Sequence, residues 1–212
     1  MNYYMDNTKK LDAYTIGLLA SDGHTTKYVS LNGSVNYHSQ LEVAEEQIIN
    51  DLCLKYDKKV FYRERVIKDK VRHFWRITFN NDDIGWCGEY LIKGRPNIFD
   101  FYNSLTEFDK SEFVRGVFDG DGTIVINKTR HTVGFSVNSN QEDMRKILLD
   151  FANRYNLKIS EYFDKRGSGS WYLSFNNKYA ITTFYHLFFD NKPEVKNERK
   201  YKIFKEYYDS VV

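Results

Sequence analysis

Apolar positions along the chain predict the same order of elements twice. An apolar segment with helical spacing comes first and is followed by a strand pair, a second helix, another strand pair and closing helical segments. In the first half these elements cover residues 14–23, 28–37, 41–56, 60–67 with 72–79, and a helical end near 101. In the second half they cover residues 113–122, 123–138, 142–155, 158–164 with 170–175, and 198–208. We therefore predict an α+β fold of two pseudo-twofold-related αββαββα halves, each a curved antiparallel sheet backed by helices.

Three landmarks recur at nearly one spacing, which indicates an internal duplication. The segment YTIGLLASDG at 14–23 returns as FVRGVFDGDG at 113–122, so that Asp22 and Asp121 lie 99 residues apart. Possible capping boxes begin at Ser39 and Ser139, and the only two prolines are Pro96 and Pro193. A short polar junction at 103–109 predicts two domains, 1–103 and 104–212, that pack through the two repeated apolar helices.

The repeated helices carry glycine where glycine is unfavourable, which suggests close packing. Gly17 and Gly116 each cost up to about 1 kcal/mol relative to alanine inside a helix. Together with Ala20, Ser21 and Gly120 they would let two helix backbones approach each other. Each helix ends in Asp-Gly, which predicts a left-handed glycine cap. The two aspartates would then meet at the negative ends of both helices, an arrangement that divalent cations stabilise.

The motifs GLLASDG at 17–23 and GVFDGDG at 116–122 resemble the two LAGLIDADG motifs of single-chain homing endonucleases. The resemblance implies that Asp22 and Asp121 are catalytic and bind metal, with Ser21 and Gly120 beside them as further metal ligands. It implies Mg²⁺ as the cofactor, with Mn²⁺ or Ca²⁺ able to occupy the site. Ala20 departs from the motif where the second copy has Asp119, which affects a structural contact and leaves both metal-binding acids in place.

The resemblance also suggests basic residues near the acids. Lys200, in ERKY at 198–201, matches a late basic element of the family and is expected to approach the active-site solvent. The first half has no clean copy; Lys93 is the nearest candidate, although another register would place Glu89 there. Either lysine is otherwise an ordinary surface charge. His38 with Gln40, and Asn138 with Asn140, occupy places where the family often has polar active-site residues.

Composition and charge set the chemical class only weakly. The formal net charge of +2 excludes few classes of protein. Cys53 and Cys87 have the spacing of neither a metal site nor a redox site, and we interpret them as core residues. The sequence has no membrane-length apolar run and its first six residues have no signal-peptide pattern, so we expect an intracellular protein. Basic residues crowd the predicted strand pairs and their turns, where they favour DNA binding. The candidates are Arg63, Arg65, Lys70, Arg72, Arg76, Asn127, Lys128, Arg130, Lys165 and Arg166.

These observations favour a monomeric, site-specific endonuclease that cuts both strands of duplex DNA. Two halves that each cover about one helical turn would span roughly 20 base pairs. The alternatives are an RNA maturase or a DNA-binding regulator on the same scaffold with little or no cleavage. A structural domain that binds no nucleic acid would have to explain the paired acids and the basic strands separately.

Overall fold

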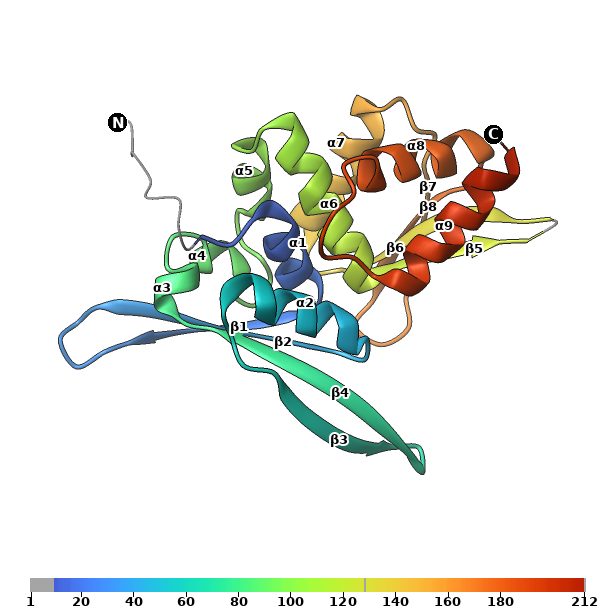
Figure 1. Cartoon of the computed structure of the whole chain (residues 1–212). Coiled ribbons are helices and arrows are strands. Elements are labelled where there is room, and N and C mark those ends of the chain that lie inside the picture. The colour runs from blue at the N-terminus through green and yellow to red at the C-terminus, as the bar shows by residue number, and fades with distance from the viewer. Residues whose placement is uncertain (1–9, 128, 212) are drawn as a thin grey trace.

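The computed structural model describes residues 10–127 and 129–211, and it contains two halves with the same order of elements (Figure 1). The first half consists of α1 (Ala13–Asp22), β1 (Gly23–Val29), β2 (Val35–Val43), α2 (Glu46–Tyr56), β3 (Phe61–Ile67), β4 (Lys70–Phe79), α3 (Asn81–Ile84), α4 (Gly88–Leu91) and α5 (Ile98–Asn103). The second consists of α6 (Glu107–Asp121), β5 (Gly122–Ile126), β6 (His131–Asn138), α7 (Glu142–Arg154), β7 (Ser160–Asp164), β8 (Ser170–Phe175), α8 (Lys178–Phe189) and α9 (Glu198–Val211). The residues at 1–6 and Lys128, both used in the sequence analysis, lie outside the described residues.

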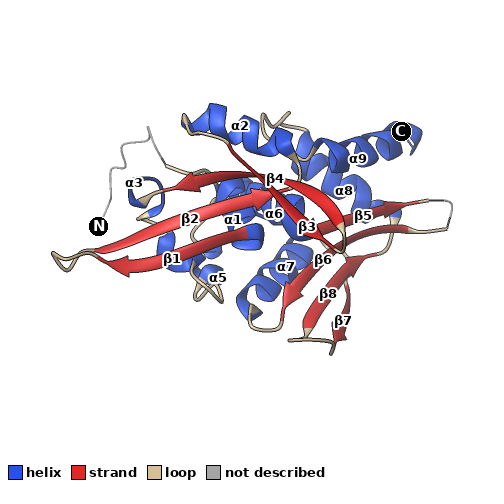
Figure 2. Ribbon diagram, turned by 90° about the horizontal axis from the view of Figure 1, so that it is seen from below, coloured by secondary structure: helices blue, strands red, loops and turns tan. Residues whose placement is uncertain are grey.

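Each half contains one four-stranded antiparallel sheet with the same topology. The strand orders are β1-β2-β4-β3 and β5-β6-β8-β7, so the second sheet repeats the first. Helices cover one face of each sheet, and Figure 2 shows the other faces of the two sheets side by side. The predicted α+β fold of two αββαββα halves is therefore confirmed. The boundary at residue 103 remains an interpretation, because α5 of the first half packs against α7 of the second.

Helices α1 and α6 lie against each other at the centre of the molecule and join the two halves (Figure 1). Strands β1 and β5 begin directly after them, at Gly23 and Gly122. On the helix-covered face of the first sheet, Leu41, Ile77 and Phe79 are fully buried. Apolar side chains from the paired helices and from both sheets thus form one continuous core.

Two local predictions are wrong, and both concern polar residues before a helix. Ser39 and Ser139 are not helix caps: Ser39 is buried in β2, where its hydroxyl lies 2.8 Å from that of Thr25. Strand β2 runs on to Val43 because its backbone pairs with β4 on the far side as well as with β1. The helix predicted from residue 41 consequently begins only at Glu46. Ser139 lies before α7 and donates to the carbonyl of Ser168 at 2.7 Å.

The predicted left-handed glycine caps are also wrong. Gly23 and Gly122 have φ values of −76° and −77°, which any residue adopts. Their small size matters for another reason. A Cβ atom on Gly23 would lie 2.4 Å from the carbonyl oxygen of Leu19, and one on Gly122 would lie 2.4 Å from that of Phe118. The chain therefore turns from helix to strand against the last helical turn, and only glycine leaves room for this turn.

Candidate active site

Two glycines allow the backbones of α1 and α6 to come into direct contact. A Cβ atom on Gly17 would lie 2.0 Å from the carbonyl oxygen of Phe113, and one on Gly116 would lie 2.0 Å from that of Tyr14. No side-chain movement could relieve either clash, since the neighbouring atoms belong to the backbone. The sequence prediction that small residues permit close approach is confirmed. This contact fixes the separation of the two helix ends.

Asp22 and Asp121 are the last residues of these helices, and both are exposed where the helices meet the strands. A Cβ atom on Gly120 would lie 2.1 Å from the Ser21 hydroxyl and 2.9 Å from a carboxylate oxygen of Asp22. Asp22 therefore points across the helix interface, at the residue beside Asp121. The two predicted metal-binding acids are brought together at one place between the sheets.

The surroundings of the two carboxylates disfavour their negative charge. Desolvation by the surrounding protein, followed by the charge of Asp121, raises the pKa of Asp22 to about 7. Desolvation likewise raises the pKa of Asp121, while the positive charges of Lys200 and Arg95 oppose this rise. Such a pair gains free energy when a cation neutralises it. Raised carboxylate pKa values in an accessible cleft are a common property of functional sites.

Lys200 is buried and holds the end of α6. Its ammonium group donates to the carbonyl oxygens of Phe118 at 2.6 Å, Asp119 at 2.9 Å and Gly120 at 3.3 Å. These are among the last carbonyls of the helix, which have no partner within it. Burial lowers the pKa of Lys200 to about 8, against the raising effect of Asp119. The predicted lysine is thus beside the acids, but it is anchored to the helix end and not free in solvent.

Arg95 performs the same structural task for α1, and the sequence analysis missed it. Its guanidinium donates to the carbonyl oxygens of Ala20 at 2.9 Å, Leu19 at 3.3 Å and Gly23 at 2.6 Å. Lys93, the predicted candidate, is exposed in the turn two residues earlier. The only sequence signal for Arg95 is a basic residue directly before Pro96, two residues after Lys93.

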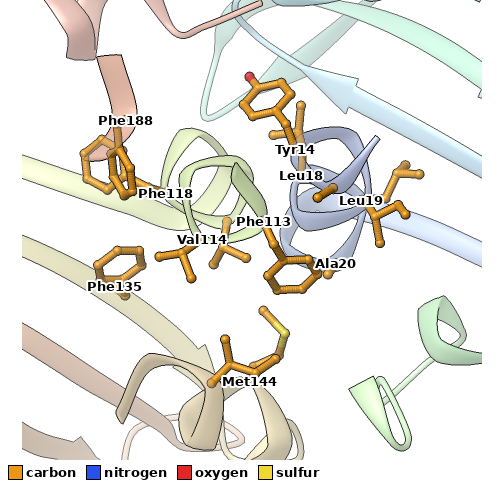
Figure 3. Packing of buried hydrophobic residues seen from close by; sticks show 14 of the residues in the cluster. Tyr14, Leu18, Leu19, Ala20, Phe113, Val114, Phe118, Phe135, Met144 and Phe188 are labelled. Carbon is orange, nitrogen blue, oxygen red and sulfur yellow. The ribbon is translucent and has the colours of Figure 1, made fainter. Parts of the chain in front are cut away.

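A buried polar cluster lies beside only one of the two acids. Asp119 accepts hydrogen bonds from the Tyr14 hydroxyl and the Asn197 backbone, both at 2.9 Å. The mirror-related positions are Ala20 and Phe113, which have neither group, and Figure 3 shows the Phe113 ring beside Ala20. The acid missing from the first motif is thus matched by a hydroxyl missing from the facing helix. The departure at Ala20 affects this structural contact.

The donor set for a metal ion is small. Among residues 10–127 and 129–211, no group of three or more His, Cys, Asp or Glu side chains could hold a metal ion. Two carboxylates remain, which suits a hard cation that keeps water and takes oxygen from a phosphate. Ser21 directs its hydroxyl at the carbonyl of Leu18, and the Gly120 carbonyl accepts from Lys200. Both oxygens keep a lone pair, so Ser21 and Gly120 stay predicted ligands beside Asp22 and Asp121, and solvent or substrate would supply the rest.

The five basic residues predicted in the first half share one face of the first sheet. Strand register pairs Arg65 with Arg72 and Arg76 with Phe61, while Arg63 and Lys70 alternate in the same phase. This face points away from the helices. Residues that alternate with the cations along the strands, such as Ile77 beside Arg76, point to the other face and are buried under the helices. In the second half the described candidates lie in turns between strands and not on strands. They are Asn127, Arg130, Lys165 and Arg166.

Comparison with known proteins agrees with this geometry. The model of the LAGLIDADG-like domain family matches residues 109–188, while no curated protein matches the chain in sequence. The homing endonuclease I-WcaI bound to its DNA recognition sequence is similar in structure, with 17% identity, a TM-score of 0.64, and coverage of 96% of this chain and 94% of that one. I-DmoI in complex with DNA and Ca gives 15% identity, a TM-score of 0.53, and coverage of 82% and 86%. I-SmaMI bound to an uncleaved DNA target is 10% identical, with a TM-score of 0.53 and coverage of 94% of this chain and 90% of that one.

These identities are low, so the structural likeness establishes the fold. The family match covers the second motif, and the first motif ends the mirror-related helix of the same fold. No helix in the described part of the chain is long and apolar enough to cross a membrane. The chain is therefore a two-repeat protein with the fold of the single-chain LAGLIDADG homing endonucleases, and residues 109–188 match the LAGLIDADG-like domain family.

Proposed function

We propose that this protein is a site-specific DNA endonuclease that uses Mg²⁺ and cuts both strands of its target. The observation that carries the proposal is the pair Asp22 and Asp121, held together at the ends of two packed helices and between two sheets. Desolvation raises both pKa values, with a further contribution from the charge of Asp121 at Asp22, and a divalent cation would favour the charged form of both carboxylates. Similar structures named for complexes with DNA and with Ca, Mn or Mg support the substrate and the type of cofactor.

The residues at the site divide the work between them. Asp22 and Asp121 would hold the metal, one acid from each half, so that each strand meets one of them. A bound divalent metal polarises the scissile phosphate and lowers the pKa of a nearby water. Lys200 and Arg95 place fixed positive charges beside the carboxylates, which helps to stabilise charge that develops on the phosphate. Both are locked in place by backbone carbonyls, so little reorganisation is needed during the reaction.

The two outward sheet faces would bind the duplex. Basic residues on the first sheet and in the turns of both halves supply affinity through phosphate contacts. Each half would cover about one turn of DNA, which gives a target of roughly 20 base pairs. The protein would act as a monomer, since the repeat provides within one chain the two halves that a symmetric dimer would otherwise supply.

The test is cleavage of a randomised duplex pool in Mg²⁺ by the wild type, Asp22→Asn and Asp121→Asn. We expect discrete double-strand cuts by the wild type and none by either variant, with duplex binding largely retained. Asp209→Asn, at an exposed position on α9, is the matched control and should cut like the wild type. A double-strand cut that survives Asp22→Asn or Asp121→Asn would overturn the assignment. Binding without cleavage in every divalent metal would favour the regulator or maturase alternative.

A further inference from the structure

The two outward sheet faces differ in chemistry, although their topology is the same. Strand register decides which side chains share a face, because successive residues of a strand point to opposite sides. Outward residues of the first sheet include five cations and one acid: Arg63, Arg65, Lys70, Arg72, Arg76 and Glu42. Outward residues of strands β5–β8, all of which are described, include no lysine or arginine. The five cations of the first sheet lie on the face that would meet DNA.

The cations on the first sheet are held at the surface and remain available. Arg63 and Arg72 are exposed, and neither forms an ion pair with any described residue. Arg65 pairs with Glu42 at 2.5 Å and lies 5.2 Å from the centre of the Phe74 ring. Phe74 supports the guanidinium of Arg65 from within the sheet face, which limits its freedom and prepares it for directional contacts.

The outward face of the second sheet carries hydroxyl, amide and aromatic groups. The Tyr172 hydroxyl lies across the sheet, 3.1 Å from the Thr123 hydroxyl, and a Cβ atom on Gly134 would lie 2.3 Å from it. Tyr162 stands opposite Tyr172 on the neighbouring strand and is 66% exposed. The remaining exposed side chains on strands of this face include Ser136, Asn138 and Ser160.

Two arginines of this half lie in turns beside the face: Arg130 donates to the hydroxyl of the outward residue Thr132 at 3.2 Å, and Arg166 pairs with an acid. Arg166 lies in the turn after β7 and donates to both carboxylate oxygens of Asp164, at 2.9 and 3.0 Å from its Nε atom. Asp164 is an outward residue of β7, so a negative charge on the face offsets the positive charge in the turn. The strands of the second sheet thus add no lysine or arginine to the outward face, against five on the first sheet.

These two surfaces suit different bases in the major groove. Arginine binds guanine through two hydrogen bonds, whereas asparagine binds adenine and apolar or aromatic groups contact the thymine methyl. We propose that the target is chemically asymmetric, with guanines read by the first sheet and an A·T-rich half-site read by the second. The first half-site also carries most of the salt dependence of binding. This inference rests on the proposed DNA-binding function and specifies the substrate further.

The experiment selects duplexes from a randomised pool with the wild-type protein in Ca²⁺ and then measures binding by fluorescence anisotropy at several salt concentrations. Arg63→Gln with Arg72→Gln should weaken binding at least about tenfold, lower the salt slope and remove guanine preference in one half-site only. Ser136→Ala with Asn138→Ala should alter preference in the other half-site and leave the salt slope unchanged. Lys202→Gln with Lys205→Gln removes the same charge from exposed positions on α9, outside the outward sheet faces, and should leave base preference unchanged.

The outcomes separate the two proposals. Guanine preference confined to the half-site that responds to the arginine pair supports the inference. Equal guanine content in both half-sites, or an arginine pair that changes neither preference nor salt slope, overturns it while the endonuclease assignment stands. If no duplex is enriched from the pool, the proposed function fails and the inference fails with it.

Discussion

Replacement of Gly116 by alanine should destabilise the whole molecule, because it adds one methyl group where two helix backbones touch. The new Cβ atom would lie 2.0 Å from the carbonyl oxygen of Tyr14 and 2.7 Å from the backbone nitrogen of Leu18. Ordinary contact begins at 3.4 Å, so α1 and α6 would have to separate by about 1.4 Å at this point. Alanine otherwise favours a helix over glycine by up to about 1 kcal/mol, so propensity alone predicts a gain.

The steric cost should exceed that gain. Overpacking of a well-packed core typically costs about 1–3 kcal/mol and more where the backbone itself must move. We expect a net loss of about 2 kcal/mol in the free energy of unfolding. For a chain of this size, that loss lowers the melting temperature by roughly 4–8 °C. Cleavage should fall even at temperatures where the variant is fully folded, since the same movement changes the separation of Asp22 and Asp121.

Thermal unfolding followed by circular dichroism measures the first effect, and DNA cleavage well below the melting temperature measures the second. Gly120→Ala provides a matched control, because its new Cβ atom meets the Ser21 side chain and not a backbone. The double variant Gly120→Ala with Ser21→Gly should be more stable than Gly120→Ala alone, because the clashing hydroxyl is gone. No second side-chain substitution can remove the backbone clash of Gly116→Ala. A melting temperature for Gly116→Ala equal to or above that of the wild type would refute the close helix contact.

Three further predictions concern the polar groups around the helix ends. Asp119→Ala and Tyr14→Phe should each destabilise the fold, and the double variant should show a coupling of about 0.5–3 kcal/mol in chemical unfolding; strict additivity would contradict their direct contact. Arg95→Gln leaves buried carbonyls of α1 without donors and should lower the free energy of unfolding, measured by urea titration, by about 2–4 kcal/mol. A loss below about 0.5 kcal/mol would contradict the capping role of Arg95. The raised pKa of Asp22 makes the folded protein hold a proton that the unfolded chain releases. Without metal, the free energy of unfolding should therefore fall as pH rises from about 4 to about 7. Bound Mg²⁺ favours the charged carboxylate, so added Mg²⁺ should reduce this fall; a free energy of unfolding that is independent of pH between about 4 and 7 without metal would contradict this reasoning.

Much of the fold could be predicted from sequence because the duplication doubles each signal. Helix α1, the second strand pairs and α7 lie within a few residues of the predicted ranges, whereas α6 begins at Glu107, within the predicted polar junction and six residues before the predicted start at 113. The errors arose where tertiary contacts override local patterns. Ser39 and Glu42 have the spacing of a capping box, yet pairing of β2 with β4 keeps both in a strand. The glycines after the acids resemble helix caps, yet their role is to make room for the last helical turn.

The candidate site was predictable where one residue type repeats at one spacing. Asp22 and Asp121 satisfy that condition, and their proximity across the interface follows from the glycines before them. Arg95 does not satisfy it, because it lies 73 residues after its motif acid while Lys200 lies 79 residues after its own. A long guanidinium reaches the helix end from one chain position and an ammonium reaches it from another. Such equivalence appears only in three dimensions.

The unequal contacts between α1 and α6 determine how the two halves would behave if the chain were divided between them. Two copies of the second half would bury Asp119 against phenylalanine, and two copies of the first would face Tyr14 with alanine, so each self-pair leaves a polar group without its partner. Only unlike halves restore the hydrogen bond of 2.9 Å. Separately expressed halves should therefore prefer to assemble with each other, because the unequal contacts between α1 and α6 specify heteromeric pairing.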